Sequence, residues 1–282
     1  SGENIEDYEY EGLKNNLIKN NIYLGKVSRI EPSLQAAFID FGRERHGFLS
    51  FNDIQSDYYQ IPTGDKDELK KAEEKIREDL KENEEIEIGE KNNDDGSEKQ
   101  KNNEADSSEI KESNENKSEK FRESLKNRYG IRKYKIQEVI KPGQVILIQV
   151  IKEERGQKGA ALTTFISIAG KYIVLMPNTP KGGGISRKIF NSSDRQKIRN
   201  ILNSIEIPKS MGVIVRTAGA NKTKNEIEKD FQNTLKTWEE IKDKALDSDA
   251  PSLVYEEGDI IKRTLRDTYD NDTKNVYVEG ND

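Results

Sequence analysis

The chain has 282 residues, of which 32% are hydrophobic, and it carries a net charge of −6 with no cysteine and a single histidine. The absence of cysteine excludes disulfides, thiolate metal sites and thiol nucleophiles, and one histidine excludes sites built from several histidines. The hydrophobic fraction is too low for the whole chain to bury a core, so part of it is expected to be disordered. No apolar run approaches the roughly 20 residues of a transmembrane helix, which predicts a cytoplasmic protein without a transmembrane segment.

Charge is divided unevenly along the chain. Acidic residues outnumber basic ones 21 to 12 between Gly64 and Lys120, whereas basic residues outnumber acidic ones 14 to 4 between Lys152 and Lys224. The second stretch can therefore bind a polyanion although the chain as a whole is acidic.

The first predicted elements are strands between about Asn20 and Pro62, where short bursts of alternating apolar and polar residues are broken by Gly, Pro and Ser. Strand character returns at Tyr134–Ile136 and at Gln144–Ile151. Residues 64–130 between them are rich in Glu, Lys, Asn, Asp and Ser. That composition cannot offset its ordering entropy, so it predicts a disordered insertion that interrupts one barrel, with transient helix near its start.

Strands and helices alternate in the second half of the chain. Strands are predicted at Tyr172–Met176 and Gly212–Arg216, and a helix between them places four apolar residues on one face: Ile198, Ile201, Leu202 and Ile205. The next helix opens with Thr223 and Glu226, spaced as a capping box. One side of it carries Ile227, Phe231, Trp238 and Ala245. This alternation indicates an α/β unit.

Aromatic and cationic residues are interleaved in the first strands. The aromatic residues are Tyr23, Phe38, Phe41 and Phe48, and the cationic residues and histidine among them are Lys26, Arg29, Arg43, Arg45 and His46. Stacking combined with charge is how a small barrel binds single-stranded RNA. The alternative is that the rings are core, and the pattern does not decide between the two for any one ring. His46 as a general base has no serine or carboxylate arrangement to support it.

The segment Phe38-Ile-Asp-Phe-Gly-Arg-Glu-Arg-His-Gly-Phe-Leu-Ser, after Gly25-Lys-Val-Ser-Arg-Ile, closely resembles the S1 RNA-binding barrel. Glu31-Pro-Ser-Leu-Gln-Ala-Ala-Phe and Glu153-Glu-Arg-Gly-Gln-Lys-Gly-Ala-Ala-Leu-Thr-Thr narrow the resemblance to the ribonuclease E/G family. It continues through Ala169-Gly-Lys-Tyr-Ile-Val-Leu-Met-Pro-Asn, Gly183-Gly-Ile-Ser-Arg-Lys-Ile and Met211-Gly-Val-Ile-Val-Arg-Thr-Ala-Gly. The resemblance covers nearly everything outside the insertion.

The resemblance implies an α+β fold: an S1-type OB-fold β-barrel with a long disordered insertion, then an α/β 5′-sensor lobe and a partial RNase H-like subdomain. The expected boundaries are 20–63 and 131–158 for the barrel, 64–130 for the insertion, 159–261 for the sensor lobe, and 1–19 with 262–282 for the RNase H-like part.

The resemblance also implies site residues. Those expected to contact RNA are Phe38, Phe48, Lys158, Arg187 and Lys188. Arg216 and Thr217 are expected to bind a 5′-monophosphate, with backbone near Val174 and Gly170 framing the terminal base. A guanidinium fork matches phosphate oxygens and a hydroxyl adds a donor, so the chemistry agrees. The alternatives are a solvated strand end for Arg216-Thr217 and a solvated basic pair for Arg187-Lys188.

Family members are single-strand-specific endoribonucleases of RNA processing and decay. They use Mg²⁺ held by two aspartates and form homotetramers through a structural Zn²⁺ link, and no residue of this chain corresponds to either set. The resemblance thus implies an RNA-binding, 5′-end-sensing N-terminal piece without catalytic or metal-binding residues, inactive alone. Asp259, Asp267, Asp270 and Asp272 are interpreted as a surface cluster. The alternatives are a standalone S1-type RNA-binding regulator without nuclease activity and an S1 protein of translation, against which the sensor motif argues.

Overall fold

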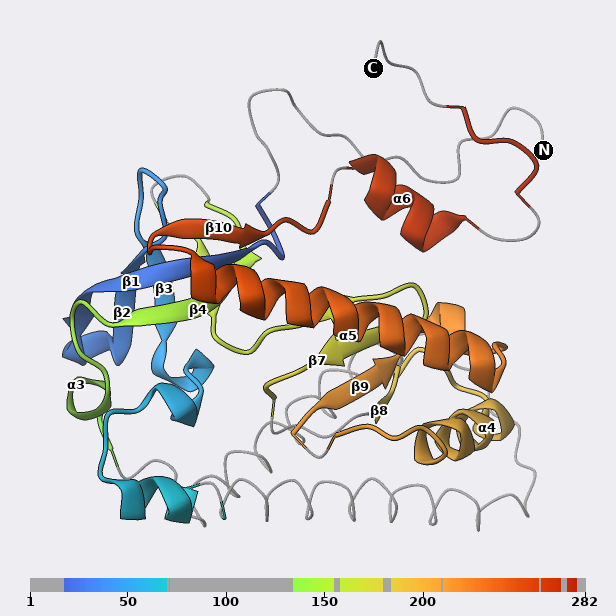
Figure 1. Cartoon of the computed structure of the whole chain (residues 1–282), viewed down its shortest axis with the longest axis horizontal. Helices are drawn as coiled ribbons and strands as arrows, with labels where there is room; N and C mark the ends of the chain where they lie inside the picture. Colours follow the sequence, from blue (N-terminus) through green and yellow to red (C-terminus); the bar gives the residue numbers. More distant parts are fainter. Residues whose placement is uncertain are drawn as a thin grey trace, which may run out of the picture.

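The structure, a computed structural model, describes residues 18–69, 71, 134–154, 158–179, 184–208, 210–258, 260–269 and 273–277. Two sheets lie side by side, and a long helix runs along both (Figure 1). Among the described helices, none combines the length and the hydropathy that a membrane span requires.

Five strands close into a barrel: β1 (Ile22–Glu31), β2 (Ala36–Asp40), β3 (Gly47–Ser50), β4 (Val145–Lys152) and β5 (Ala161–Thr163). Their order is β1-β2-β3-β5-β4, and β4 pairs back with β1. Every neighbouring pair in the barrel is antiparallel except β3 with β5, which is parallel. This is the OB-type barrel that the sequence predicts.

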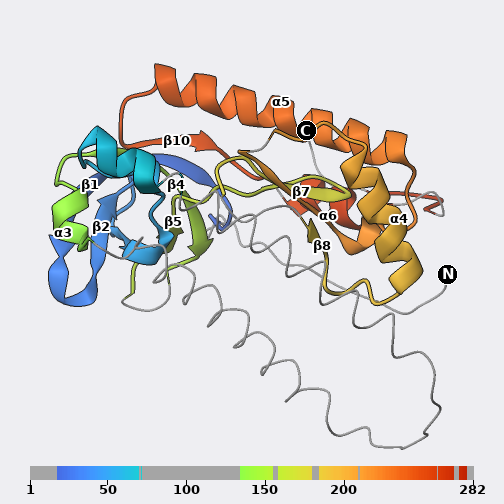
Figure 2. The ribbon, with the colours of Figure 1, turned by 90° about the horizontal axis from the view of Figure 1, so that it is seen from below.

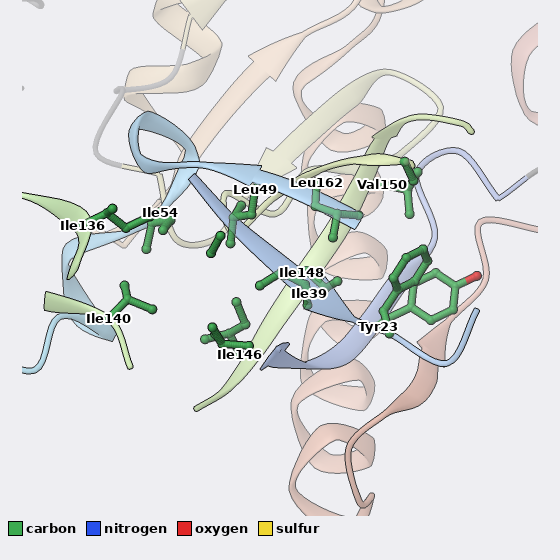
Figure 3. Packing of buried hydrophobic residues seen from close by; sticks show 14 of the residues in the cluster. Tyr23, Ile39, Leu49, Ile54, Ile136, Ile140, Ile146, Ile148, Val150 and Leu162 are labelled. Atoms are coloured by element: carbon green, nitrogen blue, oxygen red, sulfur yellow. The ribbon is translucent and has the colours of Figure 1, made fainter. Parts of the chain in front are cut away.

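The barrel core follows from the period of two along its strands. Alternate residues such as Ile39, Leu49, Ile146 and Ile148 are almost fully buried and point into the interior (Figure 3). Helix α3 (Ile136–Val139) adds Ile136 to the same core.

The structure corrects the strand predicted at Tyr134–Ile136. Ile136, Val139 and Ile140 are spaced as on a helix and are all buried, and Lys135 N donates to Glu138 Oε2 at 2.7 Å. The helical spacing of the buried residues therefore determines the secondary structure of this segment, although its β-branched residues favour a strand.

The insertion does not begin at Gly64. Residues 63–69 are helical, Leu69 is 6% exposed in the barrel core, and Tyr134 Oη donates to Asp65 Oδ2 at 2.7 Å. The apolar contact of Leu69 extends the barrel unit at least to that residue. The expected disorder of the segment concerns mainly residues 72–133, which lie outside the described residues.

The second sheet has the order β6-β7-β9-β8. Its strands are β6 (Ile168–Ala169), β7 (Ile173–Met176), β8 (Gly184–Ile185) and β9 (Gly212–Val215). Helix α4 (Ser192–Asn203) covers it with Ile198, as predicted, and its N-cap Asn191 accepts from Ser193 N at 3.0 Å.

Two strands that were assigned to the sensor lobe belong to the barrel sheet. β5 closes the barrel, and β10 (Ser252–Tyr255) pairs antiparallel with β1. Both are too short to show an alternating pattern in sequence. The expected RNase H-like part lies largely outside the described residues. Of it, α6 (Ile260–Thr268) and residues 273–277, which form no strand, are described.

Helix α5 (Lys224–Asp247) joins the two sheets. The predicted capping box is present, with Thr223 N donating to Glu226 Oε2 at 2.9 Å. The N-terminal half packs Ile227 and Phe231 on the second sheet, and the C-terminal half packs Ile241 against β1 and β10. Trp238 contacts both clusters. The view from below shows α5 running beside both sheets (Figure 2).

We expect Trp238→Ala to lower the free energy of unfolding by about 3 kcal/mol, because it removes a large apolar side chain from two clusters at once. Leu246→Ala, on the same helix but 84% exposed, should change it by less than about 0.5 kcal/mol. Urea unfolding followed by circular dichroism measures both. Equal effects of the two substitutions would mean that α5 does not join the sheets.

Candidate nucleic-acid interface

The barrel separates its aromatic residues into two groups. Tyr23 and Phe41 are 6% and 1% exposed and meet edge to face in the core, with ring centroids 5.1 Å apart. Phe38 and Phe48 occupy the alternate positions of β2 and β3, are only partly buried and lie outside that core. The core interpretation therefore holds for the first pair and fails for the second.

Phe38 and Phe48 form one aromatic surface. They are direct partners across β2 and β3, and their ring centroids are 6.1 Å apart in an edge-to-face arrangement. The guanidinium of Arg29, from β1, lies 4.3 Å from the centre of the Phe38 ring. A ring pair with a cation at its side has the components that stack bases and hold the RNA backbone.

Lys158 lies beside β3, the strand of Phe48, although it precedes β5 in the second segment of the barrel. It is exposed, and the next residue, Gly159, lies so close to the carbonyl of His46 that a side chain there would clash. Phe48 N then donates to Ala160 O at 2.7 Å. Lys158 is thereby placed at the start of β3, beside the exposed β2–β3 loop.

The second group of predicted residues meets at one end of the second sheet. Arg216 follows β9, and its Nη1 donates to the carbonyl of Gly170 at 2.8 Å. Val174 lies on β7 opposite Ile214, so it shares the outer sheet face with Arg216, two residues beyond Ile214. The structure brings Arg216, Gly170 and Val174 together.

Arg187 and Lys188 arrive at the same end because β8 and β9 are parallel. Ser186 N donates to Val215 O at 2.9 Å, so the chain leaves β8 where Arg216 and Thr217 leave β9. Arg187, Lys188 and Thr217 are all exposed. Their side chains are accessible to a polyanion.

Sequence reasoning missed the carboxylate that shapes this end of the sheet. Asp230, on α5, accepts from the backbone N–H groups of Lys171, Tyr172 and Ile173 at 3.2, 2.8 and 3.1 Å. A Cβ on Gly170 would lie 2.6 Å from its Oδ2, so only glycine fits there. In the sequence, the one feature that could have pointed to Asp230 is its place directly before Phe231, which is predicted on the apolar side of the helix.

A row of ion pairs was also missed. Arg216 Nη1 donates to Asp267 Oδ1 at 2.8 Å. Arg266 holds both oxygens of Asp267 at 3.0 Å and donates from Nη1 to Glu257 Oε1 at 3.0 Å. Partial burial raises the pKa of Asp267, but hydrogen bonds and charges from Arg266 and Arg216 outweigh it and hold that pKa below its usual value. Asp267 is therefore ion-paired rather than part of a free surface cluster; Asp259, Asp270 and Asp272 lie outside the described residues.

Two lysines and two tyrosines border this site. Lys171 Nζ and Lys222 Nζ lie 5.6 and 5.2 Å from the Tyr172 ring centre, and Lys171 Nζ lies 5.2 Å from that of Tyr269. Arg216 N donates to Tyr172 O at 2.8 Å, so the backbone of Tyr172 lies directly beside that of Arg216. In the described part of the chain, no three His, Asp or Glu side chains are grouped as metal ligands.

Comparison with known protein sequences identifies relatives of this chain. The sequence profile of the ribonuclease E/G family matches residues 167–282. Ribonuclease E of Escherichia coli (strain K12) is 35% identical over 278 residues, which are 99% of this chain and 20% of that protein. A putative ribonuclease E of Buchnera aphidicola (subsp. Baizongia pistaciae) is 32% identical over 278 residues, covering 99% of this chain and 52% of that protein.

Ribonuclease E of Synechocystis sp. is 38% identical over 144 residues, which are 51% of this chain and 21% of that protein. The chain thus spans only 20% to 24% of the length of four ribonuclease E sequences that it matches over 99% of its own length. Because the matches extend through both the barrel and the second sheet, the chain belongs to the ribonuclease E/G family.

Proposed function

We propose that this chain binds single-stranded RNA on the outer face of the barrel and recognises a 5′-monophosphate at Arg216. It would serve as the part of an endoribonuclease of RNA processing and decay that binds the RNA and recognises its 5′ end. Membership of the ribonuclease E/G family supports the substrate class.

The observation that carries the proposal is the state of the Arg216 guanidinium. Its Nη1 is bonded to Gly170 O and Asp267 Oδ1, whereas Nε and Nη2 have no hydrogen-bond partner among the described residues. The side chain is 29% exposed. Nε and Nη2 form the parallel pair of donors that binds phosphate oxygens bidentately.

The surroundings favour a terminal phosphate over an internal one. Gly170, whose carbonyl contacts Arg216, lies in a turn with no room for a side chain, and Val174 offers an apolar surface on the neighbouring strand. A base can lie against such a surface while its phosphate meets Arg216 and Thr217. Arg187 and Lys188 at the same sheet end add positive charge for the following phosphates.

Arg216→Ala should abolish most of the preference for a 5′-monophosphate over a 5′-hydroxyl. A terminal monophosphate carries more than one negative charge, and each hydrogen bond to a charged group contributes about 1.5 to 3 kcal/mol, so a preference of roughly ten-fold or more is expected. Arg216→Lys keeps the positive charge but loses the planar pair of donors, so it should retain part of the preference. Thr217→Val should reduce the preference less than Arg216→Ala does.

The measurement is competition binding of oligonucleotides that are identical except at the 5′ end. Equal binding of both ends by the unaltered chain would contradict 5′-end recognition. A full preference in Arg216→Ala would show that another residue carries it.

Phe48→Ala should weaken binding of single-stranded RNA by about 1 to 3 kcal/mol whatever its 5′ end, because one stacking surface is lost. Leu34→Ala, which removes an apolar side chain 60% exposed on the same barrel, is the matched control and should bind like the parent. Fluorescence anisotropy over a salt titration measures both. A folded Phe48→Ala protein with parental affinity at every salt concentration would exclude stacking on this ring.

A further inference from the structure

We propose that Asp267 is a positioning residue of the 5′-phosphate site: it holds Nη1 of Arg216 so that the Nε–Nη2 edge faces the RNA end. This inference rests on the proposed function, and it assigns a role to a residue that does not itself touch the phosphate.

Both hydrogens of Arg216 Nη1 are already donated to acceptors within the protein. A guanidinium Nη1 carries two hydrogens, and Gly170 O and Asp267 Oδ1 accept one each at 2.8 Å. One acceptor alone would leave the planar group free to swing about that contact. Two acceptors, one from the β6–β7 turn and one from α6, fix the direction of the remaining edge.

Asp267 is itself fixed by a second fork. Arg266 donates from Nε to Oδ1 and from Nη2 to Oδ2, both at 3.0 Å, so the carboxylate cannot rotate without losing a bond. Arg266 Nη1 in turn donates to Glu257 Oε1 at 3.0 Å, and the Glu257 side chain is only 8% exposed. The arrangement is an alternating row of two acids and two arginines.

The row is anchored on the barrel. Asn20 Nδ2 donates to Glu257 Oε2 at 2.5 Å, and Glu257 N donates to Asn21 Oδ1 at 3.1 Å. Arg216 is thus held from two directions, by α6 and the barrel edge through Asp267 and by α5 through Asp230 and the Gly170 turn. Both contacts exist before any ligand binds, so the phosphate does not have to order the guanidinium.

An opposite role is conceivable for the same contact, in which Asp267 occupies the place of the phosphate and must be displaced. The free Nε–Nη2 edge argues for positioning, because a phosphate can bind there while both Nη1 bonds remain. The paired Arg266 offsets the charge of Asp267, which reduces its repulsion of the incoming anion. The two roles predict changes of opposite sign.

The test compares Asp267→Ala and Asp267→Asn with the parent in competition binding of 5′-monophosphate and 5′-hydroxyl oligonucleotides. Asp267→Ala should reduce the ratio of the two affinities roughly five-fold or more without changing the affinity for the hydroxyl-ended RNA. Asp267→Asn keeps an oxygen for Arg216 Nη1 and should restore part of the ratio. Asp243→Ala and Asp243→Asn, at an exposed site on α5, control for the loss of a negative charge.

A double-mutant cycle separates positioning from a merely structural role. In an Arg216→Ala background, Asp267→Ala should cause no further loss of the ratio, because the group it positions is gone. A further loss there, an unchanged ratio in the single variant or an increased ratio would each overturn the inference. If Asp267→Ala melts well below the parent, the nearly isosteric Asp267→Asn carries the test.

The outcomes also distinguish this inference from the proposed function. A parent chain without any 5′ preference contradicts both. A preference that Arg216→Ala abolishes and both Asp267 variants keep contradicts the positioning role alone.

Discussion

The single apolar stripe of α5 is the constraint on which the arrangement depends. One helix covers the second sheet with Phe231 and the barrel sheet with Ile241, and Trp238 contacts both clusters. The same helix presents Asp230 to the turn that carries Gly170, the carbonyl partner of Arg216. Burial of one helix face therefore sets both the relation of the sheets and the orientation of the guanidinium, because the carboxylate that shapes the turn comes with the helix.

The two proposed contacts with RNA differ in their physics. Phe38 and Phe48 offer ring faces, and stacking on them is insensitive to base identity and to the end of the strand. Arg216 offers a fixed pair of donors that matches two oxygens of one phosphate, and a terminal monophosphate adds a further charge and a further oxygen that an internal phosphate lacks. The barrel would supply affinity for single-stranded RNA, and the edge of the second sheet would discriminate between 5′ ends. The ion-pair row runs from Glu257, which is bonded to Asn21 beside the barrel, through Arg266 and Asp267 to Arg216.

Sequence reasoning succeeded where local patterns decide the structure. Alternation predicts the barrel strands, and the structure has them. Phe38 and Phe48, which the motif resemblance assigns to RNA contact, lie outside the core, and that contact stays a prediction. It failed where pairing partners are distant or elements short. Strand β5 has three residues, and Ile136 begins helix α3 because Ile136, Val139 and Ile140 follow a helical period that the segment Tyr134–Ile136 is too short to show. Asp267 was interpreted as part of a surface cluster, and its pairing with Arg216 was missed because charged residues make up 35% of the chain, so nothing marks one acid as the partner of an arginine 51 positions away.

The most direct measurement is a structure of the chain bound to a short single-stranded RNA with a 5′-monophosphate. The account predicts that the terminal phosphate lies within hydrogen-bond distance of Nε and Nη2 of Arg216, with Nη1 still bonded to Gly170 O and Asp267 Oδ1. A phosphate bound elsewhere, or bound at Nη1 with Asp267 displaced, would contradict it.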